Sequence, residues 1–186
     1  MAGKIPFFIL LSCFSFIVQA NAQKNYDITN PVIGVRLGYQ LIDGGKAEPG
    51  MINAEQYGID GGVNFYNQWQ LRLGYQFGRQ LTSDNTGVQL NTSLLKSELG
   101  YRWELATNTS LFTQLGAVYW NLNKALSNRN VINSKGFSPL AEVGFYFQLR
   151  NNFSLDFGYQ YINKIGSRKT GTYNSNLFFV GLIHPI

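Results

Sequence analysis

From residue 31 onward the chain alternates between apolar positions and positions that hold glycine or a polar residue. In 33–41, for example, every odd position is apolar and every even position is glycine or polar. Strict alternation of this kind predicts a β-strand with one apolar face. Tilted strands of about 9–11 residues are long enough to cross a bilayer. We therefore predict an all-β fold, an eight-stranded antiparallel up-and-down transmembrane β-barrel, with strands at 33–41, 57–65, 69–77, 95–105, 111–119, 141–149, 153–161 and 177–186.

The connections between these segments alternate in length. Three short ones, 66–68, 106–108 and 150–152, are rich in asparagine, which tolerates the dihedral angles of tight turns. The other connections are long and cover 42–56, 82–93, 123–136 and 163–176. Short turns at one end and long loops at the other are typical of outer-membrane barrels. We expect both termini at the short-turn, periplasmic end.

Three features indicate that the apolar face points outward to lipid. Glycine is frequent on the polar face, where it makes room for large neighbours in a narrow lumen. The apolar face carries almost no charge at the strand centres, as a lipid-facing surface requires. Aromatic residues on the apolar face lie towards the strand ends and predict two interfacial girdles, formed by Trp69 and Trp103 near the short turns and by Tyr39, Tyr75, Tyr119, Tyr159 and Tyr161 near the long loops. The alternative is a soluble lipocalin-like barrel with an apolar cavity.

The N-terminal residues 1–22 have the features of a secretory signal peptide. Lys4 precedes the apolar run 5–18, and an Ala-Asn-Ala site ending at Ala22 predicts cleavage there. Alternative readings are a membrane anchor, or a lipoprotein cleaved before Cys13, the only cysteine of the chain. We expect one domain, 23–186, located in the outer membrane of a Gram-negative bacterium, without disulfides or cysteine-based metal sites.

The polar face of the predicted strands carries both acids and bases. Buried charges without partners are very unfavourable, so we expect them to form a salt-bridged plug. An eight-stranded barrel is just wide enough to be filled by side chains, and the alternative is a gated, ion-conducting lumen. The predicted lumen charges are Arg36, Asp60, Arg72, Lys96, Glu98, Arg102, Glu104, Glu142 and Asp156.

No residue set points to catalysis, a cofactor or a metal. The single histidine, His184, lies two residues before the end of the chain, and nucleophilic catalysis with a serine needs a histidine as base. The formal charge of +5 is too small to suggest nucleic acid as a partner. We therefore predict a protein that is not an enzyme and binds no cofactor.

Basic residues are concentrated in the last two long connections. The first holds Lys124, Arg129 and Lys135, the second holds Lys164, Arg168 and Lys169, and neither contains an acid. Basic loops beside the outer leaflet attract anions. The predicted partners are lipopolysaccharide phosphates or host-surface polyanions; an ordinary solvated loop is the alternative.

These features together resemble the OmpA/OmpX-type family of small eight-stranded outer-membrane barrels, over residues 31–186. The last strand, Val180-Gly181-Leu182-Ile183-His184-Pro185-Ile186, is similar to the C-terminal strand that the barrel-insertion machinery reads in this family, with His184 in the aromatic place and Ile186 in place of the usual phenylalanine. The resemblance implies that Phe178, Val180, Leu182, His184 and Ile186 face lipid.

The same resemblance implies a surface protein in contact with outer-membrane lipid and lipopolysaccharide. Family members of this size include adhesion, invasion, colonisation and serum-resistance factors that affect virulence, and plain structural proteins. We expect a non-enzymatic surface barrel that contributes to envelope integrity or host-surface adhesion through its extracellular loops. The alternatives are a small ion-conducting channel and a lipid-modifying outer-membrane enzyme.

Overall fold

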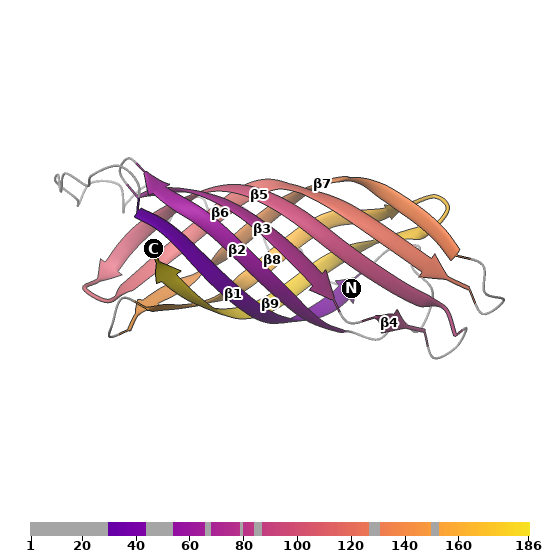
Figure 1. Cartoon of the computed structure of the whole chain (residues 1–186), viewed down its shortest axis with the longest axis horizontal. Helices are drawn as coiled ribbons and strands as arrows, with labels where there is room; N and C mark the ends of the chain where they lie inside the picture. The colour runs from indigo at the N-terminus through magenta and orange to yellow at the C-terminus, as the bar shows by residue number, and fades with distance from the viewer. Residues whose placement is uncertain are drawn as a thin grey trace, which may run out of the picture.

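The computed structural model describes residues 30–43, 54–65, 68–78, 80–83, 87–126, 131–149 and 153–186. Their eight long strands close into an antiparallel barrel, which confirms the predicted fold (Figure 1). The expected signal peptide and its cleavage site at Ala22 lie outside the described residues. The long strands are β1 (Asn30–Asp43), β2 (Ala54–Phe65), β3 (Trp69–Gly78), β5 (Gln89–Ala106), β6 (Thr109–Ala125), β7 (Val131–Gln148), β8 (Ser154–Ser167) and β9 (Gly171–Pro185).

Each long strand pairs with its neighbours in the sequence, and two contacts complete the cylinder. β1 pairs with β9, and β3 pairs with β5. A two-residue strand, β4 (Leu81–Thr82), pairs with the start of β5, beyond the point where β3 ends. The β2–β3, β5–β6 and β7–β8 connections lie at one end, called here the short-turn end, and the β6–β7 and β8–β9 connections lie at the opposite end (Figure 1).

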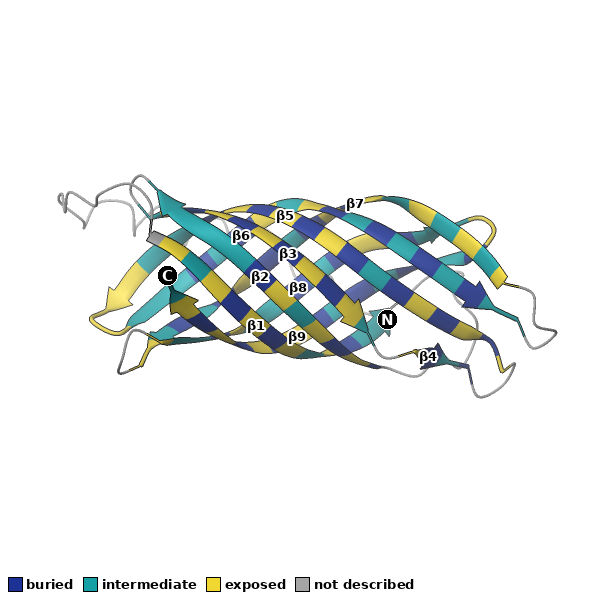
Figure 2. Cartoon of the chain, in the orientation of Figure 1, coloured by how far each residue is buried: buried dark blue, intermediate teal, exposed yellow. Residues whose placement is uncertain are grey.

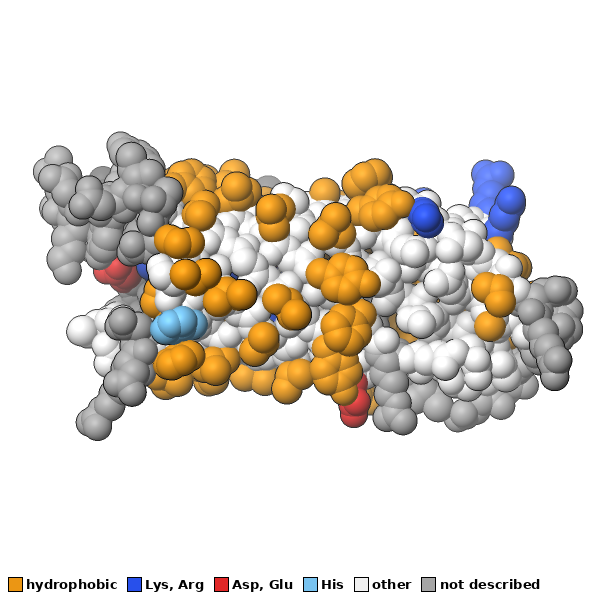
Figure 3. All heavy atoms as spheres, in the orientation of Figure 1, with side chains coloured by type: hydrophobic (Ala, Val, Ile, Leu, Met, Phe, Trp, Pro, Cys, Tyr) orange, Lys and Arg blue, Asp and Glu red, His pale blue; other side chains and the backbone are white. Residues whose placement is uncertain are grey.

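The apolar face of the barrel points outward and the polar face fills the lumen. On β3, Leu73 is 59% exposed, whereas its neighbour Arg72 is 3% exposed. Buried and exposed residues alternate along the strands (Figure 2). Hydrophobic side chains gather over the short-turn part of the surface in view, while the opposite end is mostly polar (Figure 3). This arrangement is the reverse of a soluble barrel with an apolar cavity and excludes that alternative. Among the described residues, no helix has the length and apolarity needed to span a membrane.

The lumen is crowded at several of the glycines that face inward. A Cβ atom on Gly74 would lie 2.7 Å from Cε of Lys96, and one on Gly181 would lie 2.8 Å from Cγ of Arg36. Real Cβ atoms do not approach other heavy atoms so closely, so a larger residue at either position would displace a charged side chain. Glycine is thus the residue that lets the lysine and the arginine cross the lumen.

The strands extend further from the short-turn end than the sequence predicted. β5 begins at Gln89 rather than at 95, β6 continues to Ala125, and β7 begins at Val131. Two of the predicted long loops, 123–136 and 163–176, are therefore mostly strand, joined by residues 126–130 and 168–170. The predicted strand ends were wrong because the apolar residues move there from the outward face of the strand to the inward face, which interrupts the alternating pattern.

Beyond this point apolar residues point inward and polar residues point outward. On β6, Leu115 is 69% exposed near the middle of the strand, whereas Leu122 is fully buried. The adjacent pair Leu94 and Leu95 marks the change on β5, because Leu94 is buried and Leu95 is 55% exposed. The end of the barrel opposite the short turns thus has the polarity of a soluble protein.

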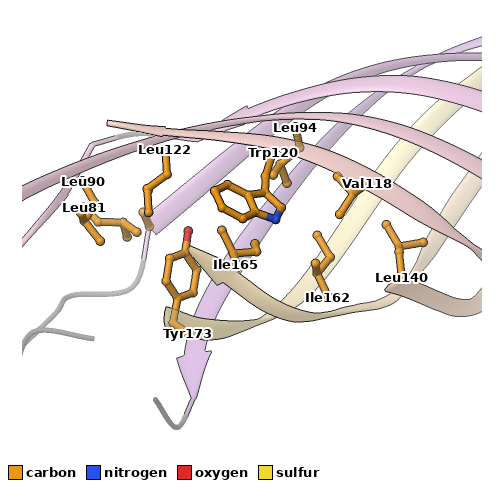
Figure 4. Packing of buried hydrophobic residues seen from close by; sticks show 11 residues of the cluster. Leu81, Leu90, Leu94, Val118, Trp120, Leu122, Leu140, Ile162, Ile165 and Tyr173 are labelled. Carbon is orange, nitrogen blue, oxygen red and sulfur yellow. The ribbon is translucent and has the colours of Figure 1, made fainter. Parts of the chain in front are cut away.

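An apolar cluster fills the barrel at this end (Figure 4). Its polar atoms are satisfied, since Nε1 of Trp120 donates to Oγ of Ser138 over 3.0 Å and the Tyr173 hydroxyl contacts Oγ1 of Thr92 at 2.9 Å. Burial raises the pKa of Tyr173 to about 12, despite the opposing effect of the hydrogen bond to Thr92. The cluster comprises Ala54, Leu81, Leu90, Leu94, Val118, Trp120, Leu122, Leu140, Ile162, Ile165 and Tyr173.

Candidate functional site

Seven of the nine predicted lumen charges meet inside the barrel, below the apolar cluster. Each is at most 6% exposed, and together they are called here the lumen charge cluster. Three cations and four carboxylates come from six strands, with β5 supplying both Lys96 and Glu98. The cluster comprises Arg36, Asp60, Arg72, Lys96, Glu98, Glu142 and Asp156.

Arg36 of β1 is the centre of this cluster. Its three guanidinium nitrogens contact three carboxylates: Nε lies 3.3 Å from Asp60, Nη1 lies 2.8 Å from Glu142, and Nη2 lies 2.8 Å from Asp156. Glu142 and Asp156 lie on adjacent strands, and the shared arginine offsets the repulsion between them. The guanidinium also lies over the ring of Phe179, 4.4 Å from its centroid.

The other two cations complete the network. Lys96 lies 3.1 Å from Glu98 and 3.4 Å from Glu142. Arg72 binds Asp60 at 3.2 Å and Asp156 at 3.8 Å. Arg72 is paired in register with Glu98 of β5, but its ion pairs go to Asp60 of β2 and Asp156 of β8.

Arg102 and Glu104 depart from the prediction that they belong to the plug. Both lie near the last residue of β5, Ala106, beyond the crowded part of the lumen. Arg102 lies over the ring of Tyr146 at 5.9 Å, and Glu104 is exposed. Among the described residues, neither contributes to the ion pairs of the lumen charge cluster.

Four basic residues line a cleft of about 470 Å³ at the end opposite the short turns. They are Lys124, Lys164, Arg168 and Lys169, and the remaining lining residues are Ser167, Gly171 and Thr172. Among the described residues no acid lines this cleft, which is called here the basic cleft. The pairing of β7 with β8 ends at Leu140 and Ile162. Beyond these residues, towards the basic cleft, the two strands are no longer paired.

The elements that carry these basic residues differ from the prediction. Lys124 lies in β6 and is 7% exposed, Lys135 lies in β7, and Lys164 lies in β8, where its φ of 64° accompanies a register shift between Ile162 and Ile165. Only Arg168 and Lys169 occupy a turn. Lys135 does not line the basic cleft, and Arg129 lies outside the described residues.

The aromatic residues proposed as girdles lie on the outer face, and those towards the long connections lie within their strands rather than at the ends, as Tyr119 does in β6 and Tyr159 in β8. Near the short turns, Trp69 and Trp103 both contact Tyr101, with ring centroids 5.4 and 5.0 Å apart. Towards the other end, Tyr119 contacts Phe137 at 5.1 Å and Tyr159 contacts Phe178 at 5.2 Å. Tyr39 and Tyr75 are about half exposed, and Tyr161 is partly exposed.

The last strand presents its apolar side chains outward. Phe178, Val180, Leu182 and Ile186 are 40–78% exposed. His184 is exposed on the same face and stacks on Phe153, with ring centroids 4.6 Å apart. Among the described residues, no group of three or more His, Cys, Asp and Glu side chains is arranged to hold a metal ion.

Sequence reasoning did not identify the amides and aromatic residues that also fill the lumen. Gln160 donates to Glu142 over 3.0 Å, and Gln114 donates to Gln70 over 3.3 Å. The rings of Phe112 and Tyr146 pack against each other, tilted by 31°, with centroids 4.5 Å apart. The alternating pattern puts these residues at inward positions and could have identified them. They were missed because the prediction considered charged residues alone.

Comparisons with known proteins agree with this architecture. A family model described as the OmpA-like transmembrane domain matches residues 33–182. Neisserial surface protein A has a similar structure at 12% identity, with a TM-score of 0.71 and coverage of 87% of this chain and 100% of that one. The N-terminal barrel domain of OprF from Pseudomonas aeruginosa has a TM-score of 0.58 at 15% identity, covering 84% of this chain and 99% of that one.

The attachment invasion locus protein Ail of Yersinia pestis is also similar, at 16% identity, with a TM-score of 0.52 and coverage of 84% of this chain and 97% of that one. No sequence among curated proteins matches the chain. The family match spans most of the chain and coincides with a closed eight-stranded barrel that exposes an apolar surface. The chain belongs to the OmpA-like transmembrane domain family and is a β-barrel of the Gram-negative outer membrane.

Proposed function

We propose that this barrel is a non-enzymatic surface protein whose basic cleft binds polyanions. In outer-membrane barrels the short turns face the periplasm and the longer connections face the exterior, which places the basic cleft outside the cell. The observation that carries the proposal is the convergence of Lys124, Lys164, Arg168 and Lys169 on one cleft without an acid among its lining residues. Binding there would serve host-surface adhesion or, with lipopolysaccharide as the anion, envelope integrity.

The cleft has the chemistry that sulfate and phosphate groups require. Lysine and arginine form charge-assisted hydrogen bonds to such groups, and several cations around one concavity raise the local anion concentration. The apolar cluster supports this cleft from within, since Ile165 and Tyr173, on the two strands that lead to the Arg168–Lys169 turn, are buried in it. A binding site that is held in place by a packed core loses less conformational entropy on binding than a flexible loop does.

A barrel of the same fold has been solved with a related ligand. The structure of Ail includes a complex with the heparin analogue sucrose octasulfate, and its TM-score against this chain is 0.52. At 16% identity this similarity concerns the fold and does not transfer the binding residues. It supports the proposal only by showing that a small barrel of this shape can present a surface to a sulfated sugar.

The lumen does not favour a channel. The ion pairs of Arg36 join β1 to β2, β7 and β8, and those of Lys96 join β5 to β7, so charged side chains lie across the cylinder. We infer a closed plug, which predicts no steady conductance in planar bilayers. The lipid-modifying enzyme is also disfavoured, because the only histidine, His184, stacks on Phe153 on the outer face.

The test measures binding of sucrose octasulfate, heparin and lipopolysaccharide to the folded barrel in zwitterionic detergent. The variant Lys164→Gln/Arg168→Gln/Lys169→Gln should bind at least about tenfold more weakly, and binding to the unaltered chain should weaken as salt is raised. Lys135→Gln is the matched control, because it removes one cation outside the basic cleft. Equal binding by the triple variant and the unaltered barrel would reject the proposal.

A further inference from the structure

The periplasmic mouth of the barrel holds a second electropositive cavity, separate from the basic cleft. Its volume is about 210 Å³, and the described residues that line it include two arginines, Arg72 and Arg102, and no acid. Asn64, Gln148 and Ser154, at or close to the ends of β2, β7 and β8, form its polar rim. It lies at the short-turn end, on the far side of the lumen charge cluster from the basic cleft.

Arg102 is the unusual residue in this cavity. Its only interaction with the described residues beyond the sheet hydrogen bonds of its backbone is the approach of its guanidinium to the ring of Tyr146, at 5.9 Å from the centroid. Its Nε is buried and has no hydrogen-bond partner there. A buried donor without a partner is unfavourable, so this guanidinium is set up to accept an anionic ligand from the aqueous side.

Arg72 approaches the same aromatic ring from its own strand. Its guanidinium lies 5.2 Å from the centroid of Tyr146. Its ion pairs with Asp60 and Asp156 are both made through Nη1. Arg72 also lines the cavity, so the second guanidinium is within the same concavity as that of Arg102.

The shared ring fixes the two arginines relative to each other. Tyr146 packs against Phe112 in a tilted arrangement, with ring centroids 4.5 Å apart, and its hydroxyl donates to Oε1 of Gln70 over 3.4 Å. Tyr146 thus lines the cavity, and its ring lies close to one guanidinium from β3 and one from β5. Two guanidiniums on separate strands can bind different oxygens of one tetrahedral anion, which suits phosphate better than a single planar carboxylate.

We propose that this cavity binds a phosphate group from the periplasmic side, with Arg102 as the principal ligand and Arg72 as the second. Its volume suits inorganic phosphate or a short phosphate ester. The phosphate could come from a free solute or from a lipid headgroup of the inner leaflet, because the rim lies at the membrane surface on that side. The site is independent of the basic cleft and of polyanion binding outside the cell.

The test uses the mature chain folded in zwitterionic detergent, with ¹⁵N-labelled arginine. Inorganic phosphate is titrated against chloride at equal ionic strength while the side-chain Nε–Hε signals are followed by NMR. The signal of Arg102 should shift saturably with phosphate and not with chloride. Arg102→Gln should weaken phosphate binding, read from the Arg72 signal, by about tenfold or more, as the loss of a charge-assisted pair predicts.

Four further measurements complete the test. Lys135→Gln removes a cation at the other end of the barrel and should leave binding unchanged, whereas Arg102→Lys keeps the charge and should recover part of the affinity. A boiled-versus-unboiled gel shift confirms that each variant is folded. Glycerol phosphate binding at least as tightly as inorganic phosphate supports a headgroup, and a preference for inorganic phosphate supports a solute. No saturable shift with either, or equal binding by Arg102→Gln, would overturn the proposal.

Discussion

Arg36 on β1 and Glu142 on β7 are 106 residues apart in the sequence, and their side chains meet at 2.8 Å inside the barrel. The two strands are not neighbours in the sheet, so this contact crosses the lumen rather than following its wall. The same arginine also binds Asp60 and Asp156. One side chain therefore ties four strands together from within, and the closed lumen depends on it.

Replacing Arg36 should destabilise the barrel strongly. Arg36→Met keeps much of the side-chain volume but leaves Asp60, Glu142 and Asp156 without their common partner. Breaking a buried ion pair on one side costs about 3–5 kcal/mol. Urea unfolding in lipid vesicles, followed by tryptophan fluorescence, measures this loss, and a change below about 1 kcal/mol would show that these contacts do not hold the lumen together.

The two glutamates of the lumen charge cluster should respond differently to neutralisation. Glu142 accepts contacts from Arg36, Lys96 and Gln160, whereas Glu98 forms an ion pair with Lys96 alone among the described residues. The cluster also holds four carboxylates for three cations. Glu142→Gln should therefore reduce the free energy of unfolding by about 2 kcal/mol or more, and Glu98→Gln by less. The reverse order in the same unfolding assay would contradict this assignment of partners.

A pair of substitutions on β6 tests the change of polarity along one face of one strand. Leu115 and Asn121 both point outward, but only Leu115 lies in the apolar band. Leu115→Arg should cost about 2–4 kcal/mol, because its charge would face lipid at depth. Asn121→Arg should change stability by at most about 0.5 kcal/mol, because it faces water. Similar costs for both substitutions would show that the membrane boundary lies elsewhere.

The apolar cluster should hold the extracellular hairpins in place. Trp120 is 4% exposed and packs among the buried residues of this cluster. Trp120→Ala should cost about 3–5 kcal/mol locally and open the extracellular end without unfolding the membrane part. Limited proteolysis of the folded barrel in vesicles, with Tyr119→Ala on the outer face as control, should show faster cleavage near residues 126–130. An unchanged rate of cleavage would mean that the hairpins keep their structure without the apolar cluster.

The sequence predicted the parts of the fold that a single period-two pattern governs. The strand positions near the short turns, the outward face of residues such as Leu73, and the closed antiparallel cylinder all follow from that pattern. The extracellular parts of the strands were missed because the pattern changes phase at pairs such as Leu94 and Leu95, where the environment outside changes from lipid to water. A search for alternation in the opposite phase would have found them.

The ion-pair partners could be predicted only where they are neighbours in the sheet. Arg36 and Asp60 lie on adjacent strands and meet. Arg72 passes over its register partner Glu98 and binds Asp156 across the lumen, because the barrel is narrow enough for a long side chain to reach the far wall. Such a choice depends on the curvature and tilt of the closed sheet, which the alternation of residues does not specify.

The most direct test of the whole account is the environment of the outward positions of β6 in a bilayer. Spin labels at 111, 113, 115, 117, 119, 121, 123 and 125 would be compared for accessibility to oxygen, which concentrates in lipid, and to a water-soluble nickel complex. The account predicts that oxygen dominates up to about residue 119 and that the nickel complex dominates from 121 onward, on the same face of the same strand. Lipid exposure that continues to 125, or water exposure along the whole strand, would contradict it.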